Sequence, residues 1–462
     1  MAAHSVPSPS PTTVHTVAPL PNRITHAVGR DGYLESYALG VTLLALAGAV
    51  VVLWVSAAVL RHRRGRRLLP NVPRWSVVGG NSLLVFVLSL VGVLVMVNNY
   101  VGYVPTVGDL LHPPGTAANA RLLHHLSDAA RSRVLRLDIP APNDGVATGT
   151  TYVYLPPGYD EPANAAKRYP VIYLYHGYPG HAQDWITAGR VQSTMDLLLR
   201  DHYVGPMIVV SPSVSTGYLD DDECLDAPGH FELEHYLAFD VVHAIDRTFR
   251  TYKDRAHRAI GGMSSGGYCA LNIGLHHLHR FSVILASEPY GDPGLHPLHR
   301  LLNDDWALWR ANSPSFYIPL WHFSLPVASF LDSGGFDPHT TTNALQLARQ
   351  LALRGEEATY RPAPHQHHNW REARAALPYA LIFAWQHFGH VRDGGSDRAD
   401  LAQFIRVLDY ARTLPPPRQP RQATAPPTSP PPTTPPTTPS SPSTSVAATA
   451  SPTRSATATP PG

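Results

Sequence analysis

Hydrophobic positions are most concentrated in two long stretches near the amino terminus. Residues 37–60 carry no formally charged side chain, and as a helix at about 1.5 Å per residue they would be roughly 36 Å long. That length exceeds the roughly 30 Å hydrocarbon core of a bilayer. A second apolar stretch covers residues 76–97. The pattern therefore predicts two transmembrane helices rather than two buried core helices.

The connection between these two stretches is rich in arginine. Only Arg23 and Arg30 precede the first stretch, and the next arginine after the second is Arg121. Because cytoplasmic loops retain positive charge, we expect loop 61–75 in the cytoplasm and both termini outside. A cleavable signal peptide is the competing interpretation, but the apolar run starts late, is too long and lacks a basic leader. The arginines of the loop are Arg61, Arg63, Arg64, Arg66, Arg67 and Arg74.

The pattern changes over residues 132–392, where short apolar runs alternate with helix-length amphipathic stretches. This alternation is typical of an α/β domain with a mostly parallel central sheet. The predicted strands lie at residues 134–139, 151–155, 170–175, 207–211 and 327–331, with one more ending at Ile260. The predicted helices lie at residues 191–200, 234–249, 267–277 and 341–353.

The remaining segments lie outside the two apolar spans and the α/β domain. We expect residues 1–36 to be disordered, residues 98–131 to be a linker, and residues 393–413 to form a carboxyl-terminal helix. Residues 414–462 are almost entirely Pro, Thr, Ser and Ala, a composition that buries too little apolar surface to offset the entropy of ordering. This tail is expected to be disordered, either as an inert linker or as a wall-threading or glycosylated segment.

Composition excludes several classes of protein. Charged residues make up 15% of the chain, against about 25% in an average protein. Lys and Arg number 36 and Asp and Glu 34, so the net charge of +2 argues against a nucleic-acid partner. Two cysteines exclude a disulfide-rich mini-domain, an all-thiolate zinc site and an iron–sulfur cluster.

The candidate nucleophile lies in the motif Gly262-x-Ser264-x-Gly266, directly after a short strand-like run and before a predicted helix. A sharp strand-to-helix turn exposes such a serine, and glycine on both sides lets strand and helix approach closely. The alternatives are a glycine-rich helix start without chemistry, and Ser265 as the nucleophile. Ser265 has glycine at only one of its two-residue offsets, which favours Ser264.

The loop after the strand ending at Tyr175 is the candidate oxyanion hole. Its sequence, residues 176–180, is His-Gly-Tyr-Pro-Gly, where an α/β-hydrolase places a backbone N–H donor. We predict that the amides of Tyr178 and Ser265 hold the oxyanion. Donors aimed at charge that appears only in the transition state contribute roughly 3 to 4 kcal/mol each.

A carboxylate and a histidine complete the predicted catalytic set. Asp337 follows a predicted strand and is the first choice to orient the histidine, with Asp332 second. His368 closes a cluster with His365 and His367, for which a metal site and a surface run without a role are the alternatives. The order serine, aspartate, histidine is that of α/β-hydrolases, so we expect no metal and no cofactor.

Four segments together resemble the esterase family that includes esterase D, feruloyl esterases and the mycolyltransferases. They are residues 153–159, 169–177, 261–267 and 368–370, and the resemblance extends over residues 134–388. It implies an α/β-hydrolase fold and a serine esterase or acyltransferase activity.

Details of this resemblance bear on the histidine and on the membrane anchor. In such proteins a His-Asp/Asn-Trp triplet opens with the catalytic histidine and precedes a helix resembling Arg-x-Ala-Leu-Pro. Residues 374–378 fit that register only from His368, which favours His368 over His365. One departure is Gln366-His367, where the family usually has two glycines. The two spans and residues 98–106 resemble membrane-anchored envelope esterases of high-GC Gram-positive bacteria.

The two cysteines are Cys224, in an acidic loop at residues 220–223, and Cys269, five residues after Ser264. In an oxidising exterior they can pair. Alternatively Cys269 is a small buried hydrophobe and Cys224 is free. The acidic run is typical of a solvated loop rather than of a calcium site, because it lacks the spaced Asp-x-Asp-x-Asp-Gly pattern.

The sequence therefore predicts a membrane-anchored, extracytoplasmic serine esterase or acyltransferase. The expected partners are the membrane and an ester or acyl-donor substrate, which an envelope lipid or glycan would provide. A catalytically silent envelope-binding or structural module is the main alternative, and a serine peptidase is the less favoured one.

Overall fold

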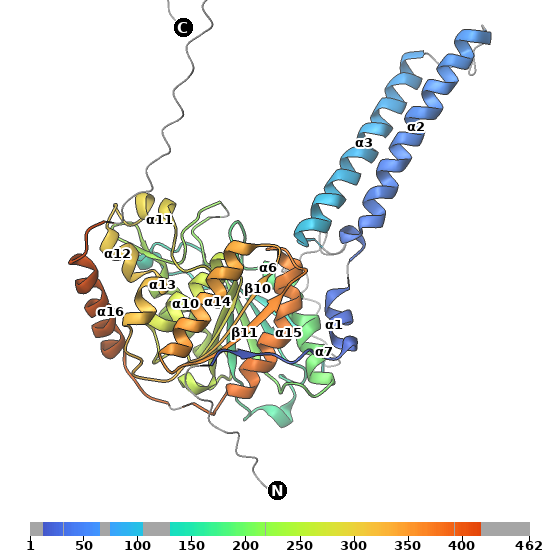
Figure 1. Cartoon of the computed structure of the whole chain (residues 1–462). Coiled ribbons are helices and arrows are strands. Elements are labelled where there is room, and N and C mark those ends of the chain that lie inside the picture. The colour runs from blue at the N-terminus through green and yellow to red at the C-terminus, as the bar shows by residue number, and fades with distance from the viewer. Residues whose placement is uncertain are drawn as a thin grey trace, which may run out of the picture. The chain divides into compact units, whose positions relative to one another are not determined.

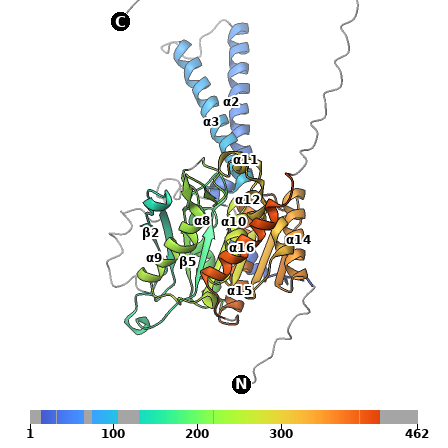
Figure 2. The same cartoon turned by 90° about the vertical axis from the view of Figure 1, so that its left-hand side faces the viewer.

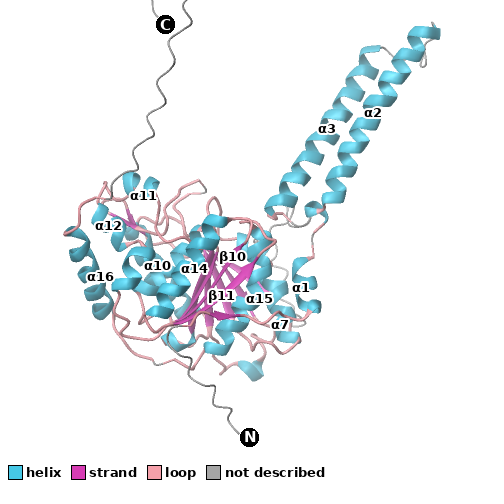
Figure 3. Cartoon of the chain, viewed as in Figure 1, coloured by secondary structure: helices cyan, strands magenta, loops and turns pink. Residues whose placement is uncertain are grey.

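The structure is a computed structural model that describes residues 13–30, 32–64, 74–104, 130–217, 219–391 and 393–416. Its folded domain has a central sheet with helices on both faces (Figure 1 and Figure 3). This architecture confirms the predicted α/β fold. The predicted tail, residues 414–462, lies outside the described residues from residue 417 onward.

The sheet has nine strands in the order β1-β11-β10-β9-β8-β4-β5-β3-β2. Neighbouring strands are parallel except at β5–β3 and β3–β2, which are antiparallel. The bounds are β1 His15–Thr16, β2 Arg133–Asp138, β3 Thr150–Leu155, β4 Val171–Tyr175, β5 Ile208–Pro212, β8 Arg258–Met263, β9 Val283–Ser287, β10 Ala328–Gly334 and β11 Glu357–Ala363. A small antiparallel pair, β6 Asp226–Ala227 and β7 Phe231–Glu232, lies apart from this sheet.

The central strands are fully buried because helices cover both faces of the sheet. Every residue of β4, β5, β8, β9 and β10 is buried. Parallel strands buried on both faces have continuous apolar runs rather than alternation. The runs Val171–Tyr175 and Val283–Ser287 are of this kind, although only the first was predicted as a strand.

The longer helices pack on the two faces of the sheet (Figure 1). One face carries α9 Val241–Thr248, α10 Ser265–His276 and α14 Pro338–Leu353, and the other carries α1 Asn22–Gly29, α7 Val191–Arg200 and α15 Trp370–His387. Figure 2 shows α9, α10 and α14 on one face, with α16 Asp397–Arg412 packed outside α10. The shorter helices are α6 Asp184–Thr187, α8 Leu233–His235, α11 Leu295–Arg300, α12 Trp306–Ala311 and α13 Pro314–Tyr317.

Helices α2 Tyr37–Arg64 and α3 Arg74–Val101 form an antiparallel hairpin. They approach closely at two glycines, because a Cβ added at Gly40 or Gly92 would lie 3.3 Å from the other's carbonyl oxygen. The segments Tyr37–Leu60 and Val78–Val101 are long and apolar enough to cross a membrane. In the most apolar part of each segment only 6% and 11% are buried, whereas a core helix of a globular domain is mostly buried.

The structure corrects the expectation that residues 1–36 are disordered. Within this segment, β1 pairs with β11, and α1 buries Ile24 and Val28 against α7 and α15. The reason is that these two apolar residues lie four positions apart and so share one helix face. Residues 1–12, which contain the three prolines behind the expectation, lie outside the described residues.

Other boundaries also differ from the predicted ones. Helix α3 runs beyond the predicted span 76–97 and ends at Val101, so the first residues of the expected linker 98–131 are helical. Residues 105–129 of that linker and residues 65–73 of the predicted loop 61–75 lie outside the described residues. The helix predicted at 234–249 is divided by a π-helical turn, Tyr236–Asp240. Strand β10 continues beyond the predicted residue 331 to Gly334.

Candidate active site

Ser264 occupies a strained turn between β8 and α10. Its φ is 59° and its ψ is −121°, a conformation that side chains rarely adopt and that costs of order 1–3 kcal/mol. Its amide donates to the carbonyl of Ser287 at the end of β9, 2.9 Å away. The turn places the serine at the carboxyl end of the central strands, where an α/β sheet carries its chemistry.

The flanking glycines are required by backbone packing. A Cβ at Gly262 would lie 2.1 Å from the carbonyl oxygen of Gly266. A Cβ at Gly266 would lie 2.2 Å from the carbonyl oxygen of Tyr175. Both distances are far below contact distance, so neither position accepts a side chain without movement of the backbone.

His368 lies between the predicted nucleophile and the predicted acid. Its Nε2 is 2.7 Å from Ser264 Oγ, and its Nδ1 is 3.1 Å from Asp337 Oδ2. The other oxygen of Asp337, Oδ1, accepts from the amides of His339 and Thr340 and so caps α14. Residues from three distant parts of the chain therefore meet at hydrogen-bond distance.

The electrostatics keep His368 neutral and Asp337 charged. Desolvation lowers the pKa of His368, and Asp337 only partly offsets this effect. Desolvation alone would raise the pKa of Asp337, but hydrogen bonds from Thr340 and His368 outweigh it, so that pKa lies below its usual value. A neutral imidazole beside a serine hydroxyl and an ionised carboxylate is the state that a general base requires.

The second-choice residues face other partners. Asp332 is buried within β10 and forms an ion pair with Arg361 at 3.2 Å. Ser265 donates its hydroxyl hydrogen to Glu223 Oε2, 3.1 Å away. The ring of His367 lies 4.8 Å from that of Phe336, and the ring of His365 lies 6.2 Å from it.

The loop chosen for the oxyanion hole lies against the nucleophile. A Cβ at Gly177 would be 3.3 Å from the Cβ of Ser264. Ser265 is the first residue of α10, where amides have no acceptor within the helix. Tyr178 is exposed, and its hydroxyl donates to the carbonyl of Leu219, 3.3 Å away.

A disulfide joins Cys224 to Cys269, which lies on α10. It fixes the acidic loop so that the adjacent Glu223 accepts hydrogen bonds from Ser265 and Tyr290. Burial raises the pKa of Glu223 well above its usual value. Sequence reasoning missed the contact between Glu223 and Ser265. Its only signal was the neighbouring Cys224, because a bond from Cys224 to Cys269 of α10 brings Glu223 to that helix.

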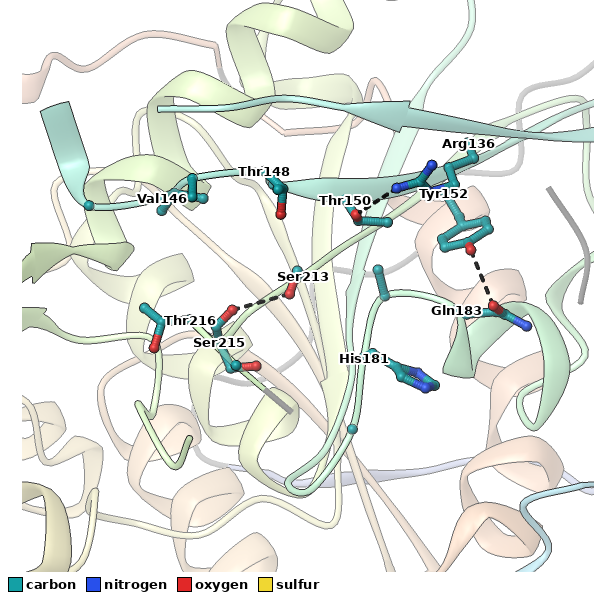
Figure 4. A pocket seen from close by; sticks show the side chains of 16 residues that line it. Arg136, Val146, Thr148, Thr150, Tyr152, His181, Gln183, Ser213, Ser215 and Thr216 are labelled. Carbon is teal, nitrogen blue, oxygen red and sulfur yellow. Dashed lines mark hydrogen bonds between the residues drawn. The ribbon is translucent and has the colours of Figure 1, made fainter. Parts of the chain in front are cut away.

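A pocket of about 420 Å³ adjoins the loop chosen for the oxyanion hole (Figure 4). Gly180 and His181 of that loop form one wall. Figure 4 shows two hydrogen bonds in its wall. Arg136 donates to the hydroxyl of Thr150, 3.2 Å away, and the hydroxyl of Tyr152 donates to Gln183, 3.1 Å away. The lining is rich in hydroxyl, amide and guanidinium groups, and also includes Thr148, Ser213, Ser215 and Thr216.

The fold and this arrangement of serine, histidine and aspartate define the class of α/β-hydrolases. The family model "Putative esterase" matches residues 148–384, about half of the chain. The chain therefore belongs to this esterase family, which confirms the resemblance in residues 134–388.

Two curated proteins match parts of the chain. The chain is 29% identical over 167 residues to an uncharacterised protein of Corynebacterium glutamicum, covering 35% of this chain and 38% of that protein. It is 36% identical over 122 residues to an endo-1,4-beta-xylanase/feruloyl esterase of Xylanibacter ruminicola, covering 26% of this chain and 16% of that protein. The chain thus spans less than half the length of these curated relatives.

A solved structure of a ferulic acid esterase is similar over the folded domain. It superposes with a TM-score of 0.50 and 26% identity, covering 56% of this chain and 99% of that chain. The α/β-hydrolase fold is therefore shared with an esterase of known structure.

Proposed function

We propose that the protein is a membrane-anchored serine esterase that hydrolyses carboxylic esters through Ser264, His368 and Asp337. The observation that carries the proposal is the position of His368, 2.7 Å from Ser264 and 3.1 Å from Asp337. Membership of the esterase family supports the ester as the substrate class. The complete arrangement of side chains argues against a catalytically silent module.

The reaction begins when His368 Nε2 takes the proton of Ser264 and Oγ bonds to the ester carbonyl carbon. The carbonyl electrons move to the oxygen, which the amides of Tyr178 and Ser265 hold. The bond to the alcohol then breaks, and the leaving oxygen takes the proton from His368. Water attacks the acyl-enzyme, gives a proton to His368, and the proton returns to Ser264 as the acid leaves.

Helices α2 and α3 support membrane anchoring. Their apolar side chains are largely exposed, which a polar solvent disfavours and a hydrocarbon environment favours. The arginine-rich connection between them supports a cytoplasmic loop, with the esterase domain and both termini outside the cell.

Acyl transfer to a hydroxyl-bearing acceptor is the second candidate activity. The pocket beside the oxyanion loop favours it, because the hydroxyl, amide and guanidinium groups in its lining offer donors and acceptors to a polyol or glycan. Product analysis with methyl glucoside as acceptor separates the two activities. Transfer predicts a glucoside ester whose yield falls when Thr150 is replaced by Val, whereas hydrolysis alone predicts only the free acid.

Replacement of Ser264 by Ala tests the proposal. We expect the full-length variant to fold, to lose turnover of 4-nitrophenyl acetate and to lose labelling by a fluorophosphonate probe. The matched variant Ser265→Ala should keep both. Labelling that persists in Ser264→Ala but is lost in Ser265→Ala would move the nucleophile to Ser265, and an unlabelled wild type would favour the silent module.

A further inference from the structure

The last turn of α3 contacts the loop that carries His368. Asn369, the next residue after His368, donates from Nδ2 to the carbonyl of Tyr100 at 2.6 Å. Arg371 donates from Nη1 to the carbonyl of Asn99 at 2.8 Å. At about 3.8 Å between successive Cα atoms, the imidazole lies on the order of 10 Å from the last turn of α3.

The membrane-proximal residues are also joined to the other side of the site. Tyr103 donates its hydroxyl to buried Asp184 at 2.6 Å, and Asp184 also accepts from the amide of His181 in the oxyanion loop. At the start of α2, buried Glu35 pairs with Arg190 at 3.1 Å and with Arg374 at 2.9 Å. Both ends of the hairpin are thus fastened by buried polar contacts.

These contacts fix the depth of the site relative to a bilayer. Exposed Tyr33, Tyr37 and Tyr100 gather at this end of the hairpin, as aromatic side chains do at a membrane interface. The polar region outside the hydrocarbon is about 5 to 7 Å thick on each side. A site on the order of 10 Å from the end of α3 therefore lies beside the polar interface.

The rim of the site continues the apolar surface of α3. The ring of Tyr100 is 5.1 Å from that of His367, which is 4.8 Å from the ring of exposed Phe336. Phe336 precedes Asp337 in the chain. On the oxyanion side, Tyr178 and Leu219 are exposed. Apolar side chains gathered at such a mouth suit the boundary between head groups and acyl chains.

We propose that the site takes its ester from an amphiphile embedded in the same membrane leaflet, rather than from a soluble ester in the surrounding water. This inference rests on the proposed esterase function. The carbonyl that Ser264 attacks would enter from the interface, with the acyl chain still in the bilayer, and substrate would arrive by lateral diffusion.

A comparison of substrate in the same and in separate vesicles tests this proposal. Full-length protein is reconstituted in phosphatidylcholine–phosphatidylglycerol vesicles containing the methylresorufin glutarate ester of 1,2-dilaurylglycerol. A second sample keeps that ester in protein-free vesicles, and 4-nitrophenyl acetate reports soluble-ester turnover in both. We expect hydrolysis at least tenfold faster in the shared bilayer, with a rate that follows the surface fraction of ester.

The outcomes separate this proposal from the function on which it rests. Equal rates in the two arrangements, or turnover of 4-nitrophenyl acetate without turnover of the bilayer ester, would overturn the interfacial substrate and leave the esterase standing. Failure on both substrates would overturn the esterase itself. Ser264→Ala supplies the background rate for each substrate.

A matched pair of substitutions sharpens the test. Leu219, 69% exposed at the rim, and Leu353, 70% exposed at the end of α14, differ mainly in position. We expect Leu219→Ser to lower the bilayer-ester rate severalfold and Leu353→Ser to leave it unchanged, with soluble-ester turnover preserved in both. An equal bilayer-ester rate in the two variants would contradict a membrane-facing rim.

Discussion

The two halves of the candidate site are held by different kinds of contact. The serine half is fixed by main chain against main chain, where Gly262 and Gly266 leave no room for a side chain. The histidine half is a loop. Its neighbours Asn369 and Arg371 donate hydrogen bonds to main-chain carbonyls at the end of α3, which lie 269 and 272 residues earlier in the chain. The first half is therefore intolerant of substitution, whereas the second depends on a distant segment.

The largest effect is expected from an added methyl group in the serine half. In Gly266→Ala the new Cβ would meet the carbonyl oxygens of Tyr175 at 2.2 Å and His176 at 2.5 Å, and neither is a flexible side chain. We expect a loss of about 3 kcal/mol or more in the free energy of unfolding. Ester turnover should fall to the Ser264→Ala background, as measured by denaturant unfolding and 4-nitrophenyl acetate hydrolysis.

Gly29→Ala is the matched control for this prediction. Gly29 ends α1, and nothing lies within 4 Å of a Cβ built there. Its stability and turnover should equal those of the wild type. A Gly266→Ala variant that keeps wild-type turnover would show that the turn can relax and that the serine half is not rigid.

The next largest effect is expected from Asp337→Asn in the histidine half. Asparagine is as good a helix cap as aspartate, so α14 keeps its first turn while the imidazole loses its negative partner. By analogy with other serine triads, we expect the turnover number to fall by roughly 10²- to 10⁴-fold. Unfolding should change little, which separates a loss of charge from a loss of structure.

The pH profile of the same variant provides a second readout. The proposed mechanism requires a neutral His368, whose pKa is lowered chiefly by desolvation, so the acid limb of wild-type activity should lie at lower pH than an unperturbed histidine would give. Asp337 raises that pKa, and its neutralisation should move the acid limb to still lower pH. An acid limb that moves to higher pH in Asp337→Asn would contradict the contact between His368 and Asp337.

Sequence reasoning was most successful where the determinants are local. The glycine pattern around Ser264 reflects contacts between adjoining elements, and the position of β4 and α7 follows from apolar runs at the right period. These features need no knowledge of the remaining chain. The family and the fold are confirmed, whereas the roles of Ser264, His368 and Asp337 stay predictions until the variants are measured.

Two of the features that sequence reasoning missed depend on distant partners. The burial of Glu35 makes sense only beside Arg190 and Arg374, which are far from it in the chain. Strand β11 was missed because its residues include Glu357 and Arg361, polar groups that the fold pairs with His387 and Glu372. Local periodicity carries no signal for such pairs.

A smaller effect is expected from removing the disulfide that supports the serine half. Cys224 and Cys269 are 45 residues apart, and a bridge closing a loop of that size stabilises a fold by roughly 2 to 4 kcal/mol. Cys224→Ala with Cys269→Ala should lower the free energy of unfolding by that amount, because the unfolded chain gains freedom. Wild-type protein unfolded in urea with a reductant should show the same loss as the double variant. An unfolding midpoint equal to that of the oxidised wild type would show that the disulfide does not stabilise the fold.

The smallest effect is expected from Tyr103→Phe, which tests whether the membrane-proximal segment positions the oxyanion side of the site. The change removes one hydrogen bond to buried Asp184, which keeps the amide of His181 as a donor. We expect a loss of roughly 1 to 2 kcal/mol in the free energy of unfolding. Any loosening of the oxyanion loop acts on the transition state, so kcat should fall, by less than about tenfold, while KM stays constant.

Exposed Tyr33 provides the matched control Tyr33→Phe, and an equal kcat in the two variants would mean that this contact fastens the domain without shaping its chemistry.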